Sequence, residues 1–255
     1  MAKNKLAKFA EMETFSNVFQ CAARDTNGHN PVVQMSGHWH ERYFGNNNPI
    51  VLELGCGRGE YTVGLAQRYP DKNFIGIDIK GARMWAGAKQ ATLASMKNVA
   101  FLRTNIELLP NFFSAGEIEE IWLTFCDPQM KKATKRLTSS YFMARYQQIL
   151  RDNGLIHFKT DSPFLYQYTR EMLKINDFTV LSDTSDLYAE ADASKWDEAR
   201  TLQTHYEQQW LERGKTIKYL CCQLRHQETY IEHDVDIEKD DYRSYGRNYV
   251  STTNH

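Results

Sequence analysis

Short runs of apolar and β-branched residues alternate with segments of helical period from Ile50 onward. The apolar runs lie at 50–54, 73–77, 99–103, 118–125 and 154–159, and the helical segments between them at 58–69, 81–96, 139–151 and 163–175. A further run at 216–222 predicts a final strand. Strands that alternate with helices at this spacing predict a parallel sheet with helices on both faces. The expected fold class is therefore α/β, doubly wound.

Polar stretches flank and interrupt this regular region. Residues 1–48 are mixed in character and end in a turn-rich stretch, which predicts an N-terminal extension with some helix. Residues 183–200 are acidic and polar, which predicts an insertion or long loop inside a domain that spans 49–225. Residues 226–255 are charged and then rich in tyrosine, arginine and asparagine, and they are expected to form a C-terminal tail.

A glycine-rich turn, Glu53–Gly59, follows the first predicted strand, and Asp78 closes the second. Glycines let the backbone approach a ligand, and a carboxylate at the end of the second strand accepts hydrogen bonds from ribose hydroxyls. A dinucleotide site needs a third glycine where this chain has Glu60 or Thr62, and a carboxylate at Glu60 would repel a pyrophosphate. The pattern favours a different nucleoside ligand. Glycines that serve packing alone are the alternative.

Several polar residues close or follow predicted strands. In open parallel sheets the ligand lies beyond the carboxyl ends of the strands, where the strand order reverses. Five residues are therefore expected to lie together at that edge: Glu53, Asp78, Asn105, Asp127 and Asp161.

A basic run follows Asp127-Pro128 at the end of the strand predicted at 118–125. Its cations are Lys131, Lys132, Lys135 and Arg136. Beside a nucleoside site, such cations would hold a polyanionic substrate without reading its base sequence. A solvated loop is the alternative.

Composition narrows the function classes. The 255 residues carry a formal net charge of -1, so any binding to nucleic acid needs a local basic patch. The chain shows no apolar run suited to a signal peptide or a membrane span, so a cytoplasmic protein without a membrane partner is expected. The five cysteines are odd in number and lack a paired ligand spacing, which predicts reduced thiols and no metal site.

The ordered motifs of the chain together resemble the bacterial tRNA (guanine-N7)-methyltransferases, which are class I S-adenosylmethionine-dependent enzymes. The matching motifs are Glu53–Gly59, Asp127–Lys132, Lys159–Asp161 and Thr204–Glu207, with Gly214 and Ile217 at the family's spacing. The resemblance spans about Pro49 to Leu220. It implies a Rossmann-like, mostly parallel sheet of seven strands. It also implies methyl transfer from S-adenosylmethionine to N7 of guanine 46 in the tRNA variable loop, with S-adenosylhomocysteine as the product.

The resemblance also implies roles for individual residues. The cofactor contacts fall on Glu53, Gly55, Gly57, Gly59, Asp78, Asn105 and Asp127. Asp127 is in addition the implied catalytic residue, and the implied substrate contacts are Lys131, Asp161, Thr204, His205, Tyr206 and Glu207. Two departures stand out. Many members carry aspartate where this chain has Asn105, and tryptophan where it has Gln129 within a sparser basic run.

Methyl transfer to guanine N7 requires little of the catalytic residues. Guanine N7 offers a lone pair and no proton, so its attack on a sulfonium methyl requires alignment more than a strong base. A carboxylate that accepts from the Watson–Crick edge would hold the base and stabilise the developing cation. Asp127 is expected in this role, supported by Asp161. Asp161 also fits a helix N-cap before Pro163, and Thr204 with Glu207 fits a capping box.

Two other functions remain open. One is a methyltransferase for another RNA base or a small molecule. The other is a non-catalytic RNA-binding subunit. Intact Glu53, Asp78 and Asp127 favour an active enzyme. The sequence leaves open whether the protein is a monomer or a homodimer.

Overall fold

The computed structural model describes residues 2–26, 28–189 and 197–240. Its strands are β1 (Val18–Gln20), β2 (Ile50–Leu54), β3 (Asn73–Asp78), β4 (Val99–Arg103), β5 (Ile118–Thr124), β6 (Leu150–Thr160), β7 (Thr179–Thr184) and β8 (Lys218–Leu224). Its α-helices are α1 (Ala2–Met12), α2 (Glu60–Arg68), α3 (Gly81–Leu93), α4 (Ser140–Tyr146), α5 (Pro163–Ile175), α6 (Asp197–Thr201) and α7 (His205–Glu212). Short helical turns are η1 (Ala23–Asp25), η2 (Val33–Met35), η3 (His40–Phe44), η4 (Ile106–Asn111) and η5 (Ala133–Lys135).

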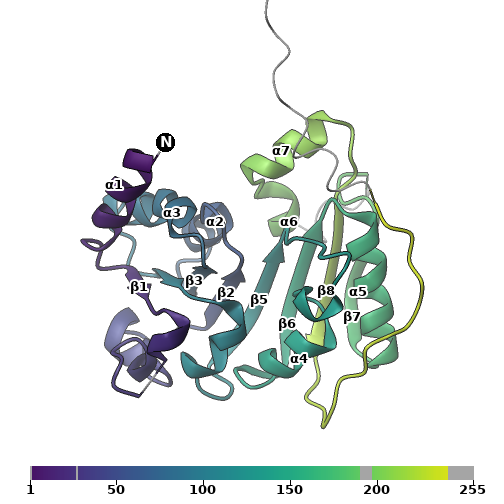
Figure 1. Ribbon diagram of the computed structural model, residues 1–255, viewed down its shortest axis with the longest axis horizontal. Coiled ribbons are helices and arrows are strands. Elements are labelled where there is room, and N and C mark those ends of the chain that lie inside the picture. The colour runs from purple at the N-terminus through teal and green to yellow at the C-terminus, as the bar shows by residue number, and fades with distance from the viewer. Residues whose placement is uncertain (1, 27, 190–196, 241–255) are drawn as a thin grey trace, which may run out of the picture.

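All eight strands join one sheet in the order β1-β4-β3-β2-β5-β6-β8-β7 (Figure 1). The first six strands in that order pair in parallel, and β8 runs antiparallel to both of its neighbours. The predicted α/β class is confirmed, and the predicted count of seven strands is wrong by one. The additional strand is β1, which adds only three residues to the edge beside β4.

The other strand that the pattern did not locate is β7. Most of its side chains are exposed because it forms the far edge of the sheet, so no apolar alternation marks it. Val180 and Leu181 are both about half exposed. The stretch 183–200, expected as an insertion or loop, begins with the last two residues of β7 and contains α6; residues 190–196 lie outside the described chain.

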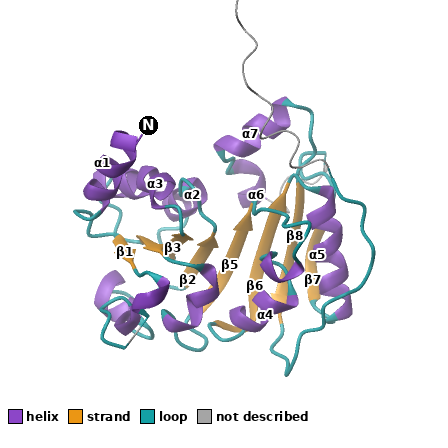
Figure 2. Cartoon of the chain, viewed as in Figure 1, coloured by secondary structure: helices purple, strands orange, loops and turns teal. Residues whose placement is uncertain are grey.

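The sheet has an apolar core on each face because successive strand residues point to opposite sides. On β2, Leu52 belongs to the cluster that α4 and α5 cover. Val51 belongs to the opposite cluster, which includes residues of α1, α2, α3 and α6. Figure 2 shows these helices on the two sides of the strands. Helices on both faces, as the alternating pattern predicted, leave the carboxyl edge of the parallel strands for ligands.

The chain on either side of residues 49–225 packs against this core. Met12 of α1 and Trp39 are completely buried, and Trp39 Nε1 donates to the carbonyl of Phe112 at 2.8 Å. The described part of the C-terminal segment runs along the outside of α5 (Figure 1). There the Ile231 N–H donates to Asn176 Oδ1 at 2.6 Å.

The strand order places a ligand position between β2 and β5. From β2 the chain adds β3 and β4 on one side, and then returns to add β5 and β6 on the other. This reversal separates the loops that follow β2 and β5. The position between them, called the crevice here, is where ligands bind in sheets of this kind. The arrows of the parallel strands β2, β5 and β6 in Figure 2 point to the edge where α6 and α7 lie.

Candidate functional site

The glycine loop after β2 turns back onto β3. The N–H groups of Gly55 and Cys56 both donate to the carbonyl of Ile77, at 2.8 and 3.0 Å. Gly55, Gly57 and Gly59 all have positive φ, at 78°, 54° and 74°. This left-handed conformation strains other residues, so glycine is required here. The loop therefore brings bare backbone to the crevice.

Asp78 joins this loop from the end of β3. Its Oδ2 accepts from the Gly57 N–H at 2.9 Å, and its Oδ1 accepts from the Lys80 N–H at 2.7 Å. Each carboxylate oxygen has a second lone-pair direction, so both remain able to accept from a ligand hydroxyl. Two backbone donors hold the carboxylate at the mouth of the loop.

Glu53 lies deeper, on β2, with only 4% of its surface exposed. Its Oε2 accepts from the Thr62 N–H at 2.8 Å and from the Thr62 hydroxyl, and its Oε1 accepts from the Thr124 hydroxyl at 2.9 Å. Burial raises the pKa of this carboxyl to about 7, although the threonine donors act to lower it. A buried carboxylate on β2 is suited to attract a cationic ligand, because among the described residues its hydrogen-bond partners are uncharged.

The loop after β5 presents Asp127. Phe125 and Gln129 on either side have positive φ, at 51° and 46°, which side chains other than glycine adopt rarely. Asp127 is exposed, and its Oδ1 accepts from the Gln129 N–H at 2.9 Å. This turn fixes the carboxylate at the strand end. Left-handed residues around an exposed carboxylate are typical of a functional loop.

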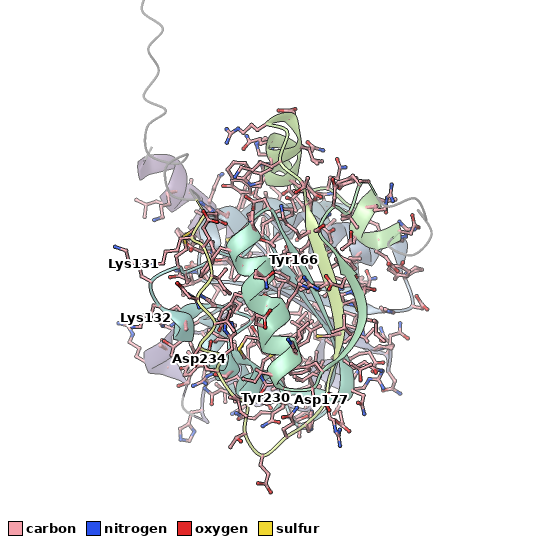
Figure 3. All side chains as sticks on the ribbon, turned by 90° about the vertical axis from the view of Figure 1, so that its right-hand side faces the viewer. Lys131, Lys132, Tyr166, Asp177, Tyr230 and Asp234 are labelled. Carbon is pink, nitrogen blue, oxygen red and sulfur yellow. The ribbon has the colours of Figure 1, made fainter. Side chains whose placement is uncertain are left out.

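The basic run that follows divides into two kinds of residue. Lys131 and Lys132 are exposed and project outward from the molecule (Figure 3). Arg136 is buried instead, with its guanidinium over the rings of Phe164 and Tyr168. It donates to two carbonyls of the Asp127 loop, those of residues 128 and 130, at 3.3 and 3.1 Å. Of these cations, only the exposed ones are placed to meet a large anion.

Asp161 follows β6 and is almost completely buried, at 1% exposure. Neither of its carboxylate oxygens has a hydrogen-bond partner within the described part of the chain, and burial raises its pKa. The N-cap alternative for this residue is wrong. Ser162 caps α5, because its hydroxyl accepts from the Leu165 N–H at 3.0 Å. An unsatisfied buried carboxylate is an acceptor that a ligand donor could use.

The segment Thr204–Glu207 begins α7 beside the glycine loop. The Thr204 hydroxyl accepts from the Glu207 N–H at 3.1 Å, so the predicted cap is confirmed. The His205 N–H donates to Glu60 Oε2 at 3.2 Å, which attaches the start of α7 to the start of α2. Tyr206 is 42% exposed and lies near Arg83.

The second half of the capping box is not formed. Glu207 is completely buried and pairs with Lys159 of β6, with Oε1 and Nζ 2.6 Å apart. Burial lowers the pKa of Lys159 to about 8 against the opposing effect of Glu207, and burial raises the pKa of Glu207. The Glu207 carboxylate therefore forms a buried ion pair in this structure.

Asn105 stands at the start of η4, just beyond β4. Its carbonyl accepts from the Leu108 N–H at 3.0 Å, and its side chain does not cap that turn. The strand order places it beyond Asp78, on the side of the crevice formed by β3 and β4. The side-chain amide is thus left for the role that the sequence predicts.

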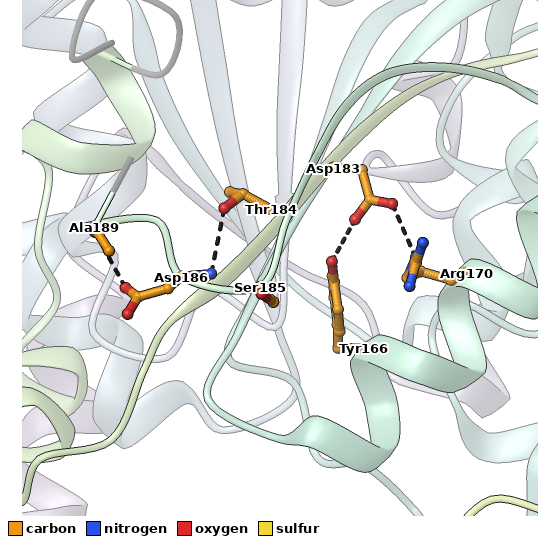
Figure 4. A pocket seen from close by; sticks show the side chains of 7 residues that line it. All are labelled: Tyr166, Arg170, Asp183, Thr184, Ser185, Asp186 and Ala189. Atoms are coloured by element: carbon orange, nitrogen blue, oxygen red, sulfur yellow. Dashed lines mark hydrogen bonds and ion pairs between the residues drawn. The ribbon is translucent and has the colours of Figure 1, made fainter. Parts of the chain in front are cut away.

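One surface hollow lies away from the crevice between β2 and β5. It measures about 440 Å³ and is formed by α5 and the end of β7 (Figure 4). Its lining residues are Tyr166, Arg170, Asp183, Thr184, Ser185, Asp186 and Ala189, none of them a predicted site residue. Tyr166 and Arg170 both donate to Asp183, so these groups already satisfy one another.

Thiol and metal chemistry receive no support from the described residues. Burial raises the pKa of Cys126 to about 12 and that of Cys56 well above its usual value, which disfavours the thiolate needed for attack. Within 2–26, 28–189 and 197–240, no group of three His, Cys, Asp or Glu side chains is placed to hold a metal ion. Across those ranges no helix is long and apolar enough to span a bilayer.

The residues at the carboxyl edge suit a nucleoside that carries a positive charge. The glycine backbone leaves room for close approach, Asp78 offers acceptors for ribose hydroxyls, and Glu53 supplies buried negative charge. S-adenosylmethionine has these features.

The structural roles of two residues were not predicted from the sequence. Arg136 is predicted with the cations that hold a polyanionic substrate, which is wrong because it is buried, and nothing in the local pattern marks it as buried. Lys159 did carry a signal, because a lysine inside an apolar strand is almost never buried without a partner. That signal predicts a buried ion pair without naming the partner.

Solved structures with a similar fold are methyltransferases. The 16S rRNA methyltransferase KamB matches with a TM-score of 0.54 and 15% sequence identity, over 70% of this chain and 89% of that chain. An antibiotic-related methyltransferase matches with a TM-score of 0.52 and 16% identity, over 71% of this chain and 89% of that chain. At this identity the likeness concerns the fold alone.

Relatives that are similar in sequence identify the family more specifically than the fold does. Residues 47–220 match a family model described as "Putative methyltransferase". A protein from Bacteroides thetaiotaomicron named tRNA (guanine-N(7)-)-methyltransferase is 55% identical over 247 residues, 97% of this chain and 96% of that protein. Proteins of the same name from Porphyromonas gingivalis and Streptococcus agalactiae serotype III are 54% and 35% identical, covering 92% and 72% of this chain and 96% and 85% of their own. The chain therefore belongs to the tRNA (guanine-N(7)-)-methyltransferase family.

Proposed function

We propose that this protein transfers a methyl group from S-adenosylmethionine to N7 of a guanine in tRNA, at position 46 of the variable loop. The observation that carries the proposal is the pairing of two loops across the crevice between β2 and β5. One presents glycine backbone and Asp78, and the other presents Asp127. A nucleoside donor and a base acceptor can therefore meet over adjoining strand ends.

The donor side is assigned to Glu53, the glycine loop, Asp78 and Asn105. Asp78 would accept from the ribose hydroxyls while the Gly57 and Lys80 N–H groups hold it. Glu53 would stabilise the positive charge of the donor from below, and Asn105 would accept from the adenine amino group. When bound, S-adenosylmethionine supplies an electrophilic methyl group on a sulfonium.

The acceptor side is assigned to Asp127 and Asp161. Guanine N7 is already nucleophilic, so these carboxylates have to orient the base and stabilise the positive charge that it gains. Asp127 is exposed at the strand end, where it can reach both base and donor. Asp161 is 1% exposed in this structure and has two unsatisfied oxygens, so a movement that uncovers it would let it accept from the N–H groups of a guanine Watson–Crick edge.

The tRNA backbone is assigned to the exposed cations and the start of α7. Lys131 and Lys132 project from the loop that carries Asp127, so they would meet phosphates next to the target base. His205 and Tyr206 are exposed at the start of α7 on the other side of the glycine loop. Action on tRNA supports the expectation of a cytoplasmic protein.

The test combines labelled donor with purified protein and a tRNA transcript, followed by nucleoside analysis. We expect 7-methylguanosine from the native transcript and none when guanine 46 is changed to adenine. The Asp127→Ala variant should lose turnover by at least about 100-fold and keep its fold, since Asp127 is exposed. Methylation of another base, or undiminished turnover by this variant, would contradict the assignment. Binding of tRNA without methyl transfer would support a binding subunit instead.

A further inference from the structure

A completely buried lysine of β6 contacts both α2 and the part of the chain that forms α6 and α7. Lys159 of β6 has none of its surface exposed, and its ammonium group contacts four different groups. It pairs with Glu207 Oε1 at 2.6 Å and donates to the Tyr61 hydroxyl at 2.9 Å. It also donates to the carbonyls of Ala199 and Leu202, the latter at 3.2 Å. Such a group is retained in a core only when it is fully partnered.

These partners come from two separate parts of the chain. Tyr61 belongs to α2, the helix that begins at the end of the glycine loop. Ala199, Leu202 and Glu207 belong to residues 197–212, which form α6 and α7 and are called the α6–α7 segment here. Lys159 therefore connects the helix behind the donor loop to the segment that carries the predicted acceptor contacts.

Other contacts show how closely the α6–α7 segment fits on α2. The side chain of Leu202 fills the space beside Gly64 in the middle of α2, where an added Cβ would lie 2.8 Å from Leu202 Cδ2. At the end of the same helix, the Arg68 guanidinium donates to the Thr201 hydroxyl at 2.6 Å. The segment is thus seated along α2, with Lys159 beneath its centre.

Glu207 faces away from any large substrate in this arrangement. Its Oε1 is shared between Lys159 and the Tyr188 hydroxyl, 2.6 Å away, and the residue has no exposed surface. The neighbouring His205 and Tyr206 are exposed. Within Thr204–Glu207, only His205 and Tyr206 can touch tRNA without rearrangement.

We propose that Lys159 is a positioning residue for methyl transfer, and that Glu207 acts through Lys159 instead of touching the substrate. The pair holds Thr204–Tyr206 against α2, so that acceptor contacts stay aligned with the donor loop. The proposal rests on the function proposed above. It predicts that loss of the pair harms use of tRNA and leaves donor binding intact.

The test is a double-mutant cycle of Lys159→Met and Glu207→Leu on kcat/KM for tRNA at saturating donor. Misalignment of the acceptor should lower kcat/KM about 100-fold in each single variant. The kcat/KM of the double variant should be no lower than that of either single variant, because both changes remove the same ion pair. Affinity for S-adenosylhomocysteine, measured by calorimetry, should change less than about threefold, since the donor contacts are untouched. The proposal would be overturned if the loss of kcat/KM in the double variant equalled the product of the two single losses. Full activity of a folded Lys159→Met variant would also overturn it.

His157→Gln is the matched control for stability. His157 is buried two residues earlier on the same strand, where it stacks on Trp122 and contacts Tyr219 and Glu120. Its loss should lower the melting temperature and leave kcat/KM for tRNA unchanged. An equal fall in kcat/KM for this control would mean that activity simply follows stability, which would overturn the positioning role.

Hydrogen exchange gives a readout that does not require activity. Lys159→Met should lose backbone protection in residues 199–212 and keep it in the glycine loop. If Lys159→Met does not fold, Glu207→Gln takes its place, because it keeps the hydrogen bonds and removes the charge. If the wild-type protein formed no 7-methylguanosine, the proposed function would fall. Hydrogen exchange would still show whether the Lys159–Glu207 pair orders the α6–α7 segment. Unchanged protection of that segment in the variant would overturn this ordering role.

Discussion

The backbone N–H of Gly57 donates to the Asp78 carboxylate at 2.9 Å, which joins the loop after β2 to the end of β3. The Lys80 N–H holds the other oxygen of the same carboxylate at 2.7 Å. A donor that binds at Asp78 would therefore meet a fixed acceptor, and little side-chain entropy would be lost on binding. Gly57 has φ 54°, which lets its N–H point at the carboxylate without strain.

Replacing Asp78 by asparagine should weaken the donor site and spare the fold. The side-chain carbonyl of asparagine can still accept from one backbone N–H, but it loses the charge that strengthens hydrogen bonds to ribose hydroxyls. We expect affinity for S-adenosylhomocysteine to fall about tenfold or more, with a change in unfolding free energy below about 1 kcal/mol. Calorimetric titration and urea unfolding give the two numbers. Unchanged affinity would remove Asp78 from the donor site.

The buried carboxyl of Glu53 should make stability depend on pH. Burial raises its pKa from 4.5 to about 7, so between these values the folded protein binds more protons than the unfolded chain. Its stabilising contribution is therefore complete below pH 4.5 and is lost as pH rises through 7. The full change is about 3 kcal/mol. Urea unfolding of wild type and Glu53→Gln from pH 5 to 8 measures it.

The glutamine variant is the control in that experiment, because it is neutral throughout the range. The difference in unfolding free energy between wild type and Glu53→Gln should shift against the wild type as pH rises. A difference that stays constant across the range would show that the Glu53 carboxyl keeps an ordinary pKa.

Exposed and buried cations of the basic run should behave in opposite ways. Changing both Lys131 and Lys132 to alanine should weaken tRNA binding and reduce the slope of log affinity against log salt by about 1–2. Stability should change by less than about 0.5 kcal/mol, since both side chains are exposed. Filter binding at several salt concentrations measures the slope. An unchanged slope would place the tRNA elsewhere.

Arg136→Met is the matched comparison. It removes the donors to two carbonyls of the Asp127 loop and the guanidinium over Phe164 and Tyr168. Stability should fall by about 1–3 kcal/mol, while the salt slope stays the same. A lowered slope would show that Arg136 reaches the phosphates after all.

Much of the fold follows from local pattern, and the exceptions have a common cause. The strands β2 to β5 are buried on both faces and show as apolar runs, and Gly55, Gly57 and Gly59 mark the turn. By contrast, β1 and β7 lie at the edges of the sheet. An edge strand has fewer buried side chains, so its pairing depends on distant chain that a local pattern does not contain.

The candidate site also contains residues that the local sequence predicts and residues that depend on distant parts of the chain. The positions of Glu53, Asp78 and Asp127 at the carboxyl edge of the sheet could be predicted because each has a fixed place relative to a strand end. The inward turn of Glu207 could not, because it depends on Lys159, 48 residues earlier in the chain, and on the burial of both. Likewise the N-cap of α5 falls on Ser162 and frees Asp161, a difference of one residue that spacing does not resolve.

Asp161 should prove dispensable for stability and needed for turnover. Its carboxylate is 1% exposed and accepts no hydrogen bond within the described chain, so asparagine in its place breaks none. We expect Asp161→Asn to change the unfolding free energy by less than about 1 kcal/mol, since large losses require a broken partner or a cavity. The guanine edge would lose a charged acceptor, so kcat/KM for tRNA should fall about 100-fold. Urea unfolding and steady-state methylation measure the two effects. A large loss of stability with unchanged turnover would make Asp161 a residue of the fold instead of the acceptor site.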